Sequence, residues 1–186
     1  GGAPRRVDIG LLNGVPFHSI SGVGYSAIMA RERERARRWI PFSRALSFLW
    51  AASRTLLFAK PLAVDIVIDG EHRISVADGV LVTNNRFDGM PWRRGSLSDG
   101  LLEVHTFQAR GMFARLRTIV AVARGRWRQL DSLETFSTAE VTLRRRGRRR
   151  ILVATDGEIR LVRGELHYTI RAGALSVVAP SEPKAV

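Results

Sequence analysis

Two carboxylates stand two residues apart in the segment Asp156-Gly157-Glu158, directly after the apolar run 151–154. Such a run is typical of a buried strand, and side chains two apart on a strand point to the same face. On this interpretation the carboxylates lie side by side at the strand's end. Two neighbouring carboxylates cannot both ionise freely, which favours a general base that works near neutral pH. The alternative is an ordinary Asp-Gly hairpin turn followed by a solvated Glu158.

Predicted strands make up most of the framework that must hold these carboxylates. The Asn13-Gly14 dipeptide separates the first two and is a strong hairpin signal. Apolar or alternating patterns predict strands at residues 7–12, 15–20, 64–68, 73–76, 79–83, 101–107, 140–143, 151–154, 160–162, 165–170 and 175–178. We therefore expect a mainly β (α+β) fold, in which one β-sandwich-like domain over residues 1–186 carries two or three helices.

Helical spacing of apolar residues predicts helices at about 25–38, about 41–60 and 112–123. The charged half of the first helix, residues 31–38, alternates Arg with Glu and is expected to form a solvated face. The apolar contacts of the second helix are expected to be Phe42, Leu46, Leu49, Trp50, Leu56 and Leu57. In the third, Met112, Phe113, Leu116, Ile119, Val120 and Ala123 recur at the same spacing. We expect both apolar faces to belong to the core; the alternative is that they rest on a membrane.

The amino-acid composition excludes several kinds of functional site. The chain has no cysteine, which excludes a disulfide framework, a thiolate nucleophile and a zinc-thiolate site. The four histidines are scattered without ligand spacing, so a structural zinc site is not expected. No stretch approaches the ~20 apolar residues of a spanning helix, and the N-terminus lacks a signal-peptide layout. The expectation is a cytoplasmic protein.

A net charge of +13 points to a polyanionic partner, such as nucleic acid, an anionic membrane or a phosphorylated substrate. Six arginines crowd the segment 144–150, which is expected to be a hairpin tip between two strands. Because these charges repel one another, the tip is either solvated or in contact with phosphate groups. Both alternatives stay open.

The order of the motifs resembles the C-terminal domain of the soluble diacylglycerol kinase and sphingosine kinase family of lipid kinases. Five segments along almost the whole chain carry the resemblance: Val7-Asp8-Ile9-Gly10 with Asn13-Gly14, residues 17–27 with Gly22 and Gly24, Val80-Leu81-Val82-Thr83 followed by Asn84-Asn85, Asp99-Gly100-Leu101-Leu102-Glu103-Val104, and Asp156-Gly157-Glu158.

The resemblance implies roles for particular residues. Glu158 would be the general base that takes the proton from a lipid hydroxyl as this attacks the γ-phosphate of ATP, and Asp156 would position or tune it. A Mg²⁺ ion would be held by the Asp99 carboxylate and the backbone carbonyls of Ser96 and Leu101, an all-oxygen set that suits a hard cation. Without the resemblance, Asp99-Gly100 is simply a turn before a strand.

The chain departs from the family pattern in four ways. The loop 86–98 keeps only Gly89 and Gly95, where the family is richer in glycine. His18 stands where the family usually has Asn, and Glu103 where it has Asp. The family's Gly-Gly-Asp-Gly-Thr loop, whose backbone amides approach ATP phosphates closely, does not occur in this sequence. We therefore expect a domain excised or truncated from a longer kinase, without the N-terminal nucleotide-binding domain.

Three functions follow, in order of preference. The first is part of an ATP-dependent lipid kinase that acts on diacylglycerol or a related lipid alcohol and works peripherally at the inner membrane surface. The second is a non-catalytic module that binds lipids or anionic membranes, in which Asp156 and Glu158 are dispensable. The third, a nucleic-acid binder, has only charge and the segment 126–128 in its favour, so nucleic acid is not an expected partner.

Overall fold

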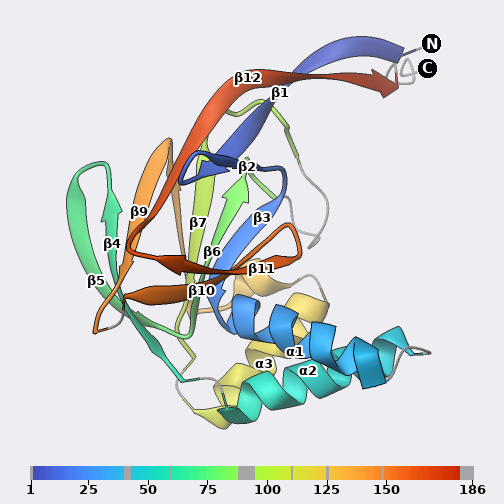
Figure 1. The fold of residues 1–186 in the computed structure, drawn as a ribbon, viewed down its shortest axis with the longest axis vertical. Coiled ribbons are helices and arrows are strands. Elements are labelled where there is room, and N and C mark those ends of the chain that lie inside the picture. The colour runs from blue at the N-terminus through green and yellow to red at the C-terminus, as the bar shows by residue number, and fades with distance from the viewer. Residues whose placement is uncertain are drawn as a thin grey trace.

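The computed structural model is a β-sandwich with a layer of helices at one end (Figure 1). The expected fold class is therefore confirmed. The structure describes residues 2–39, 43–58, 60–87, 95–109, 111–124, 126–147 and 149–180.

Each of the two sheets has six strands, and all pairings are antiparallel. The first has the order β2 (Val15–Phe17), β1 (Gly2–Leu12), β12 (Leu166–Pro180), β9 (Glu140–Arg145), β4 (Leu62–Ile68), β5 (Glu71–Ala77). The second has the order β11 (Glu158–Arg163), β10 (Arg150–Thr155), β3 (Ile20–Gly24), β6 (Gly79–Asn84), β7 (Leu102–Phe107), β8 (Leu133–Thr138).

The core lies between the sheets, because alternate side chains of the strands point inward. In β4 every second residue is buried, as the alternating pattern predicts. The ring of Phe17 meets that of Tyr168 edge to face, with centroids 6.0 Å apart, and both side chains are fully buried. Gly10 is required beside this pair, since a Cβ at that position would lie 2.4 Å from the Phe17 ring.

Two strand predictions are wrong. The segment 15–20 is not one strand: it bends at His18 and Ser19, so that β2 joins the first sheet and β3 the second. The segments 165–170 and 175–178 are parts of the single strand β12. Together with β1, this strand forms a two-stranded arm that leaves the body and carries both ends of the described chain (Figure 1).

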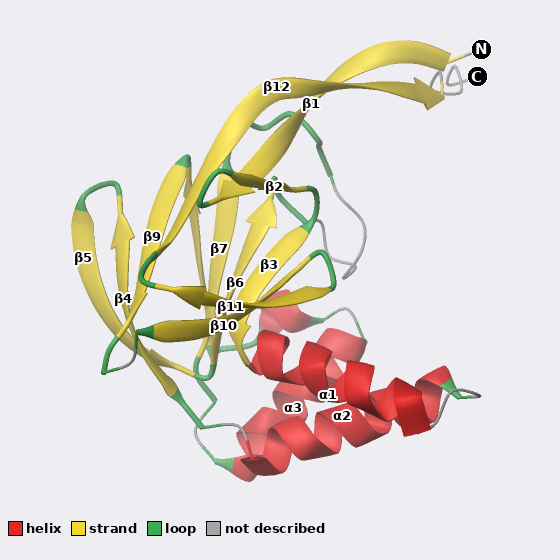
Figure 2. Ribbon diagram, viewed as in Figure 1, coloured by secondary structure: helices red, strands yellow, loops and turns green. Residues whose placement is uncertain are grey.

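Three helices cover one end of the second sheet: α1 (Tyr25–Trp39), α2 (Arg44–Phe58) and α3 (Met112–Ala123) (Figure 2). None of the described helices is long and apolar enough to cross a membrane. In α1 the expected solvated face is only partly correct, because Glu32 is 6% exposed. Its carboxylate lies within 4 Å of Arg31, Arg35 and Arg54, which compensates the charge that the helix packing buries.

The expectation that the apolar faces of α2 and α3 belong to the core is wrong for most of the residues it names. Exposed side chains on these faces are Leu46, Leu49, Trp50, Met112, Phe113, Leu116 and Val120. Phe42 and the side chains of Leu56, Leu57, Ile119 and Ala123 lie outside the described part of the chain. Periodicity identified these faces correctly, but it does not say what covers them.

Candidate active site

The Asp156 turn, Asn84 and the Asp99 loop meet at one end of the second sheet, whereas the arginine-rich tip 144–150 lies at the opposite end of β10. Neighbouring strands run in opposite directions, so the last residues of β6 and β10 lie beside the first residues of β3, β7 and β11. Thr155 pairs with Ser21 and with Glu158, and Asn84 pairs with Leu102. Segments up to 140 residues apart in sequence thus meet at one edge.

Asp156 belongs to a hairpin turn, not to a strand. Its φ of 49° and the φ of 91° at Gly157 form the two-residue connection between β10 and β11. The expected arrangement of both carboxylates on one strand face is therefore wrong, and the hairpin-turn alternative describes the backbone. The Asp156 carboxylate accepts hydrogen bonds from the backbone N–H groups of His18, Ser19 and Ile20, at 2.6, 2.9 and 3.1 Å.

Glu158 is the first residue of β11, and its side chain is exposed. One carboxylate oxygen, Oε2, lies 2.5 Å from Arg160 Nη2. The carboxylate is thus open to solvent at the same edge as the turn that Asp156 anchors. Its catalytic role stays a prediction.

A second Asp-Gly-Glu occurs at residues 69–71, between β4 and β5, and sequence reasoning did not identify the duplication. Its backbone is the same, with φ of 51° at Asp69 and 80° at Gly70, and Glu71 also lies beside the arginine two residues on. The Asp69 carboxylate, however, accepts from the Thr138 hydroxyl at 2.9 Å. The tripeptide is therefore a turn signal, and its surroundings distinguish the two copies.

Asn84 and Asn85 connect the Asp156 turn to the loop that carries Asp99. The Asn84 amide Nδ2 donates to the carbonyls of Asp8 and His18, at 3.0 and 3.1 Å. Asn85, in the left-handed region at a φ of 63°, accepts from the Asp99 N–H at 3.1 Å. Asn84, the last residue of β6, and Asn85, which follows it, therefore bind backbone groups of the segments on either side.

Asp8, on β1, also holds the loop that carries Asp99. Sequence reasoning missed this role. It lies at an irregularity in the β1–β12 pairing and is 4% exposed. Its carboxylate accepts from the N–H groups of Gly100 and Gly173, both at 2.7 Å, and its own N–H donates to the Leu97 carbonyl. The available signal was an acidic residue inside the predicted strand 7–12, whose other residues are apolar.

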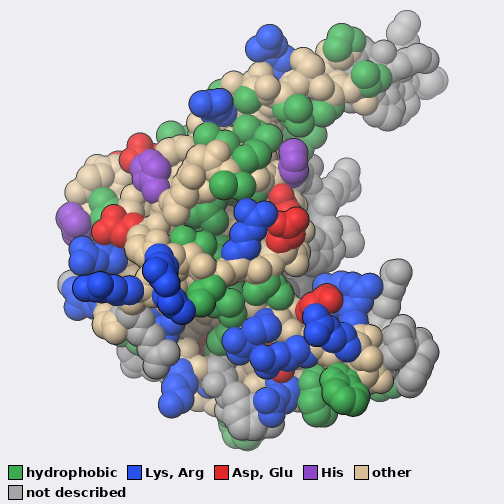
Figure 3. Space-filling model, in the orientation of Figure 1, with side chains coloured by type: hydrophobic (Ala, Val, Ile, Leu, Met, Phe, Trp, Pro, Cys, Tyr) green, Lys and Arg blue, Asp and Glu red, His purple; other side chains and the backbone are tan. Residues whose placement is uncertain are grey.

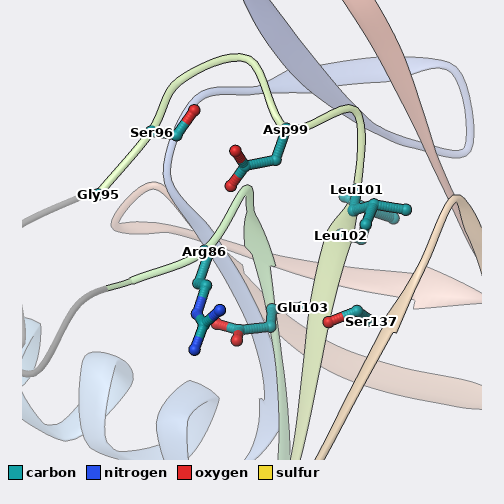
Figure 4. A pocket seen from close by; sticks show the side chains of 8 residues that line it. All are labelled: Arg86, Gly95, Ser96, Asp99, Leu101, Leu102, Glu103 and Ser137. Atoms are coloured by element: carbon teal, nitrogen blue, oxygen red, sulfur yellow. The ribbon is translucent and has the colours of Figure 1, made fainter.

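The loop borders a pocket of about 490 Å³, shown in Figure 4. All three predicted metal-site residues line it, with Ser96 and Asp99 on the loop and Leu101 just before β7. Among the described residues, no group of three or more His, Cys, Asp or Glu side chains could hold a metal, and no hydrogen bond or ion pair engages the Asp99 carboxylate. The loop thus offers one carboxylate together with backbone carbonyls.

Glu103 lies in the wall of this pocket and belongs to a buried charged cluster. Arg128 Nη2 lies 2.7 and 3.0 Å from its two carboxylate oxygens, and His105 Nε2 lies 3.3 Å from Oε2. Burial alone would raise the pKa of Glu103, but hydrogen bonds from His105 and Arg128 hold that pKa below its ordinary value. Burial lowers the pKa of His105. Arg128 of the segment 126–128 is thus bound to Glu103, and the expectation that nucleic acid is not a partner stays a prediction.

The arginine-rich tip joins β9 to β10, as expected. Arg146 Nε lies 2.6 Å from Asp65 Oδ1, and Arg144 Nη1 lies 3.6 Å from Glu165 Oε1. Arg148 lies outside the described residues. Asp65 of β4 and Glu165, just before β12, thus offset part of the charge, and contact with phosphate stays a prediction.

Solved structures with the same fold come from Bacillus anthracis str. Sterne. A candidate diacylglycerol kinase superposes with a TM-score of 0.68 at 17% identity, covering 95% of this chain and 57% of that chain. A diacylglycerol kinase gives 0.58 at 13%, covering 95% and 54%, and another candidate gives 0.64 at 16%, covering 95% and 57%. The chain thus spans little more than half the length of these proteins, and at such identities the likeness shows the fold alone.

No curated protein matches the chain. The family model of the YegS C-terminal NAD kinase beta sandwich-like domain matches residues 19–179, which include every motif of the candidate site except Asp8 and His18. The sequence resemblance to the C-terminal domain of lipid kinases is thereby confirmed, and the chain belongs to the family of YegS C-terminal NAD kinase beta sandwich-like domains.

Proposed function

We propose that this chain forms the acceptor side of an ATP-dependent lipid kinase, which transfers the γ-phosphate to the hydroxyl of diacylglycerol or a related lipid alcohol. The observation that carries the proposal is the meeting of Glu158, the Asp156 turn and the Asp99 loop at one end of the second sheet. Family membership and the naming of its structural neighbours as diacylglycerol kinases support it.

Glu158 acts as the base in this proposal. Its carboxylate accepts the hydroxyl proton while the lipid oxygen forms a bond to the γ-phosphorus, and the bond from that phosphorus to the β–γ bridging oxygen breaks. The products are a phosphorylated lipid and ADP, and the protonated Glu158 returns its proton to water. An exposed carboxylate at the edge of a sheet is accessible to a separate nucleotide-binding domain that carries ATP.

Asp156 positions Glu158 in this scheme. Three backbone N–H groups hold its carboxylate, so the β10–β11 turn is fastened to residues 18–20 and Glu158 starts β11 at a fixed place. Since this sequence has no Gly-Gly-Asp-Gly-Thr loop, ATP would be bound mainly by another part of the natural gene product.

The Asp99 loop fits Mg²⁺. Its donors are oxygens, and a single carboxylate with backbone carbonyls suits an ion that keeps several of its waters. The Asp99 carboxylate and the carbonyls of Ser96 and Leu101 would hold the ion, although the Leu101 carbonyl also accepts from the Asn85 N–H at 3.1 Å. When bound, Mg²⁺ would supply a fixed positive charge beside the network that orders this end of the sheet.

The test is transfer of labelled phosphate from ATP to a panel of lipids in anionic mixed micelles, with the full-length protein. Glu158→Gln is expected to lower kcat by about 10²–10⁴-fold, the usual contribution of a general base. Glu71→Gln is the matched control, because Glu71 follows the same turn and pairs with an arginine in the same way. Absence of any phospholipid product from the folded wild type would overturn the kinase proposal and favour the non-catalytic lipid-binding module.

A further inference from the structure

The hairpin of β10 and β11 carries opposite charges at its two ends. Asp156 and Glu158 lie at the end that belongs to the candidate active site, whereas Arg150 and Arg163 form the last pair at the other end. Arg160, the third arginine of these two strands, lies beside Glu158. The basic end is therefore separated from the candidate active site by the length of the hairpin.

Arg150 and Arg163 lie directly opposite each other on neighbouring antiparallel strands, so their side chains share one face of the sheet. The next pair, Ile151 and Val162, packs into the core, which places both arginines on the outer face. Both are exposed. Like charges directly opposite each other destabilise a strand pair. The chain thus keeps a repulsive pair at a position where a neutral residue would relieve the repulsion.

The acidic side chains that reach the arginine-rich tip bind other arginines. Glu165 lies beside Arg144, and Asp65 lies beside Arg146. In the part of the chain that the structure describes, no ion pair engages the opposed pair on β10 and β11, nor the exposed Arg149 that precedes it. Three positive charges therefore lie together without a counter-charge from the protein.

The backbone at this end of the hairpin is closed. The Gly164 N–H donates to the Arg149 carbonyl at 3.0 Å, and Gly164 has a φ of 84°. Figure 3 shows basic side chains gathered at the end of the sandwich where β9 and β10 meet. The sequence of the tip, residues 144–150, contains only Arg and Gly, so it has no apolar side chain for a bilayer or a protein partner to bury.

We propose that Arg149, Arg150 and Arg163, here called the basic corner, bind a soluble anion that carries two adjacent phosphate groups, as in inorganic pyrophosphate. A guanidinium group matches the geometry of phosphate oxygens and can bind two of them at once. A single phosphate group carries about two negative charges and would leave one of the three arginines unmatched. Two adjacent phosphate groups supply enough charge for all three, and they relieve the repulsion between the opposed pair.

Binding at the basic corner does not depend on the proposed kinase activity. The corner and Glu158 lie at opposite ends of β11, so a ligand at one does not occupy the other. Glu158→Gln is therefore expected to bind pyrophosphate at the corner as the wild type does. Failure of the kinase test and failure of this proposal are distinguishable.

The experiment is hydrogen exchange at Gly164 in the full-length protein, titrated with inorganic pyrophosphate while NaCl keeps the ionic strength constant. The Gly164 amide reports on the corner itself, so a pyrophosphate ion bound elsewhere does not mimic the signal. Exchange in the wild type should slow and saturate. The double variant with Arg150→Gln and Arg163→Gln should raise the Kd by at least about tenfold, because it removes two charge-assisted contacts.

The matched control is a double variant with Arg37→Gln and Arg38→Gln. These two exposed arginines lie at the end of α1, and their replacement lowers the net charge by the same amount. The Kd should stay within about twofold of the wild type, because exposed charges far from the site are screened at constant ionic strength. The control thus separates a local site from a general effect of net charge.

Stability without pyrophosphate gives a second measurement with the opposite sign. The variant of Arg150 and Arg163 should have a higher urea midpoint than the wild type at low salt, because the repulsion across the hairpin is removed. A variant that is more stable and yet binds less does not act through unfolding. A lower midpoint would show that the two arginines stabilise the hairpin and would contradict the repulsion on which the proposal rests.

Three further results would overturn the proposal. The first is that NaCl alone slows exchange at Gly164 as much as pyrophosphate does, which would leave the corner as a solvated group of charges. The second is an equal rise in Kd in both double variants. The third is that anionic vesicles or an RNA oligonucleotide slow exchange at Gly164 while pyrophosphate does not, which would assign the corner to a membrane or to nucleic acid.

Discussion

The two Asp-Gly-Glu turns of this chain have the same sequence, the same backbone and the same arginine two residues after the glutamate, yet they differ in what they anchor. Asp69 accepts from one hydroxyl, that of Thr138. Asp156 accepts from three consecutive backbone N–H groups where the chain crosses from one sheet to the other. A motif therefore acquires a possible function from the segments that the fold brings beside it, and the copy at residues 69–71 is an internal control for the copy at 156–158.

We expect the largest difference between the two turns in lipid kinase activity, when the glutamate of each turn is replaced. Glu158→Gln should abolish most lipid phosphorylation, while Glu71→Gln should change kcat by less than about twofold, because only Glu158 lies at the end of the second sheet that carries the Asp99 loop. Equal activity in both variants would break the comparison and leave Asp-Gly-Glu as a turn in both places.

The next largest effect concerns Asp8, which supports the end of the sheet near Asp156 and has no contact with the Asp69 turn. Asp8→Asn turns an amide N–H toward one of two backbone donors. We expect it to lower the free energy of unfolding by about 2–3 kcal/mol, as for hydrogen bonds to a buried charged group. Urea unfolding measures the loss, and hydrogen exchange at Gly100 should accelerate. Unchanged exchange at Gly100 would show that the loop is held by other contacts.

A smaller effect distinguishes the two aspartates. Asp156→Ala frees three backbone N–H groups at an exposed turn, and we expect it to cost about 1–2 kcal/mol, in the range of lost helix caps. Asp69→Ala removes one hydroxyl contact and should cost about 0.5–1 kcal/mol. Chemical denaturation measures the free energy of unfolding of both variants. A larger loss of this free energy for Asp69→Ala than for Asp156→Ala would contradict the prediction.

The smallest effect at neutral pH comes from the cluster of Glu103 and His105. Because burial lowers the pKa of His105, the unfolded chain binds more protons below the ordinary value of 6.5, so stability falls as pH decreases through that value. The lowered pKa of Glu103 adds a loss as pH falls below its ordinary value of 4.5.

Urea midpoints between pH 8 and 4 should show both losses for the wild type, for Glu71→Gln and for Glu158→Gln. His105→Gln should remove the upper part of the slope. A stability that does not change between pH 8 and 5 in the wild type would contradict the assigned direction for His105.

Much of the sandwich could be predicted because local signals agree with the global packing. Alternating apolar residues gave β4, and the turn dipeptides Asn13-Gly14 and Asp69-Gly70 adopt the left-handed backbone that such hairpins require. The break at His18 and Ser19 was missed because both halves of that segment are extended and read as one strand. The break is held by long-range contacts, from Asp156 at 136 to 138 positions away and from Asn84, which no local pattern reveals.

The residues of the candidate site could be named from family motifs. The contacts that hold those residues in place could not be predicted. Asp99 and Ser96 indeed line one pocket, and the predicted roles of Glu158 and Asp156 remain to be tested. The supporting contacts of Asp8 and Arg128 depend on long-range pairing, which no local pattern encodes. In α2 and α3 the helical period was correct and the environment of Leu49 and Phe113 was not, because a period defines a face without naming its neighbour.

The arm formed by β1 and β12 also determines how the molecule responds to force. Gly2 pairs with Pro180, so the two ends of the described chain emerge side by side at the tip of an antiparallel ribbon. Cross-strand hydrogen bonds in such a ribbon are perpendicular to the strands. Pulling the ends apart therefore loads these bonds one pair after another, as in a zipper, and the arm should open at low force. The irregular pairing at Asp8, where a carboxylate fastens β12 and the Asp99 loop together, is where we expect this unzipping to pause.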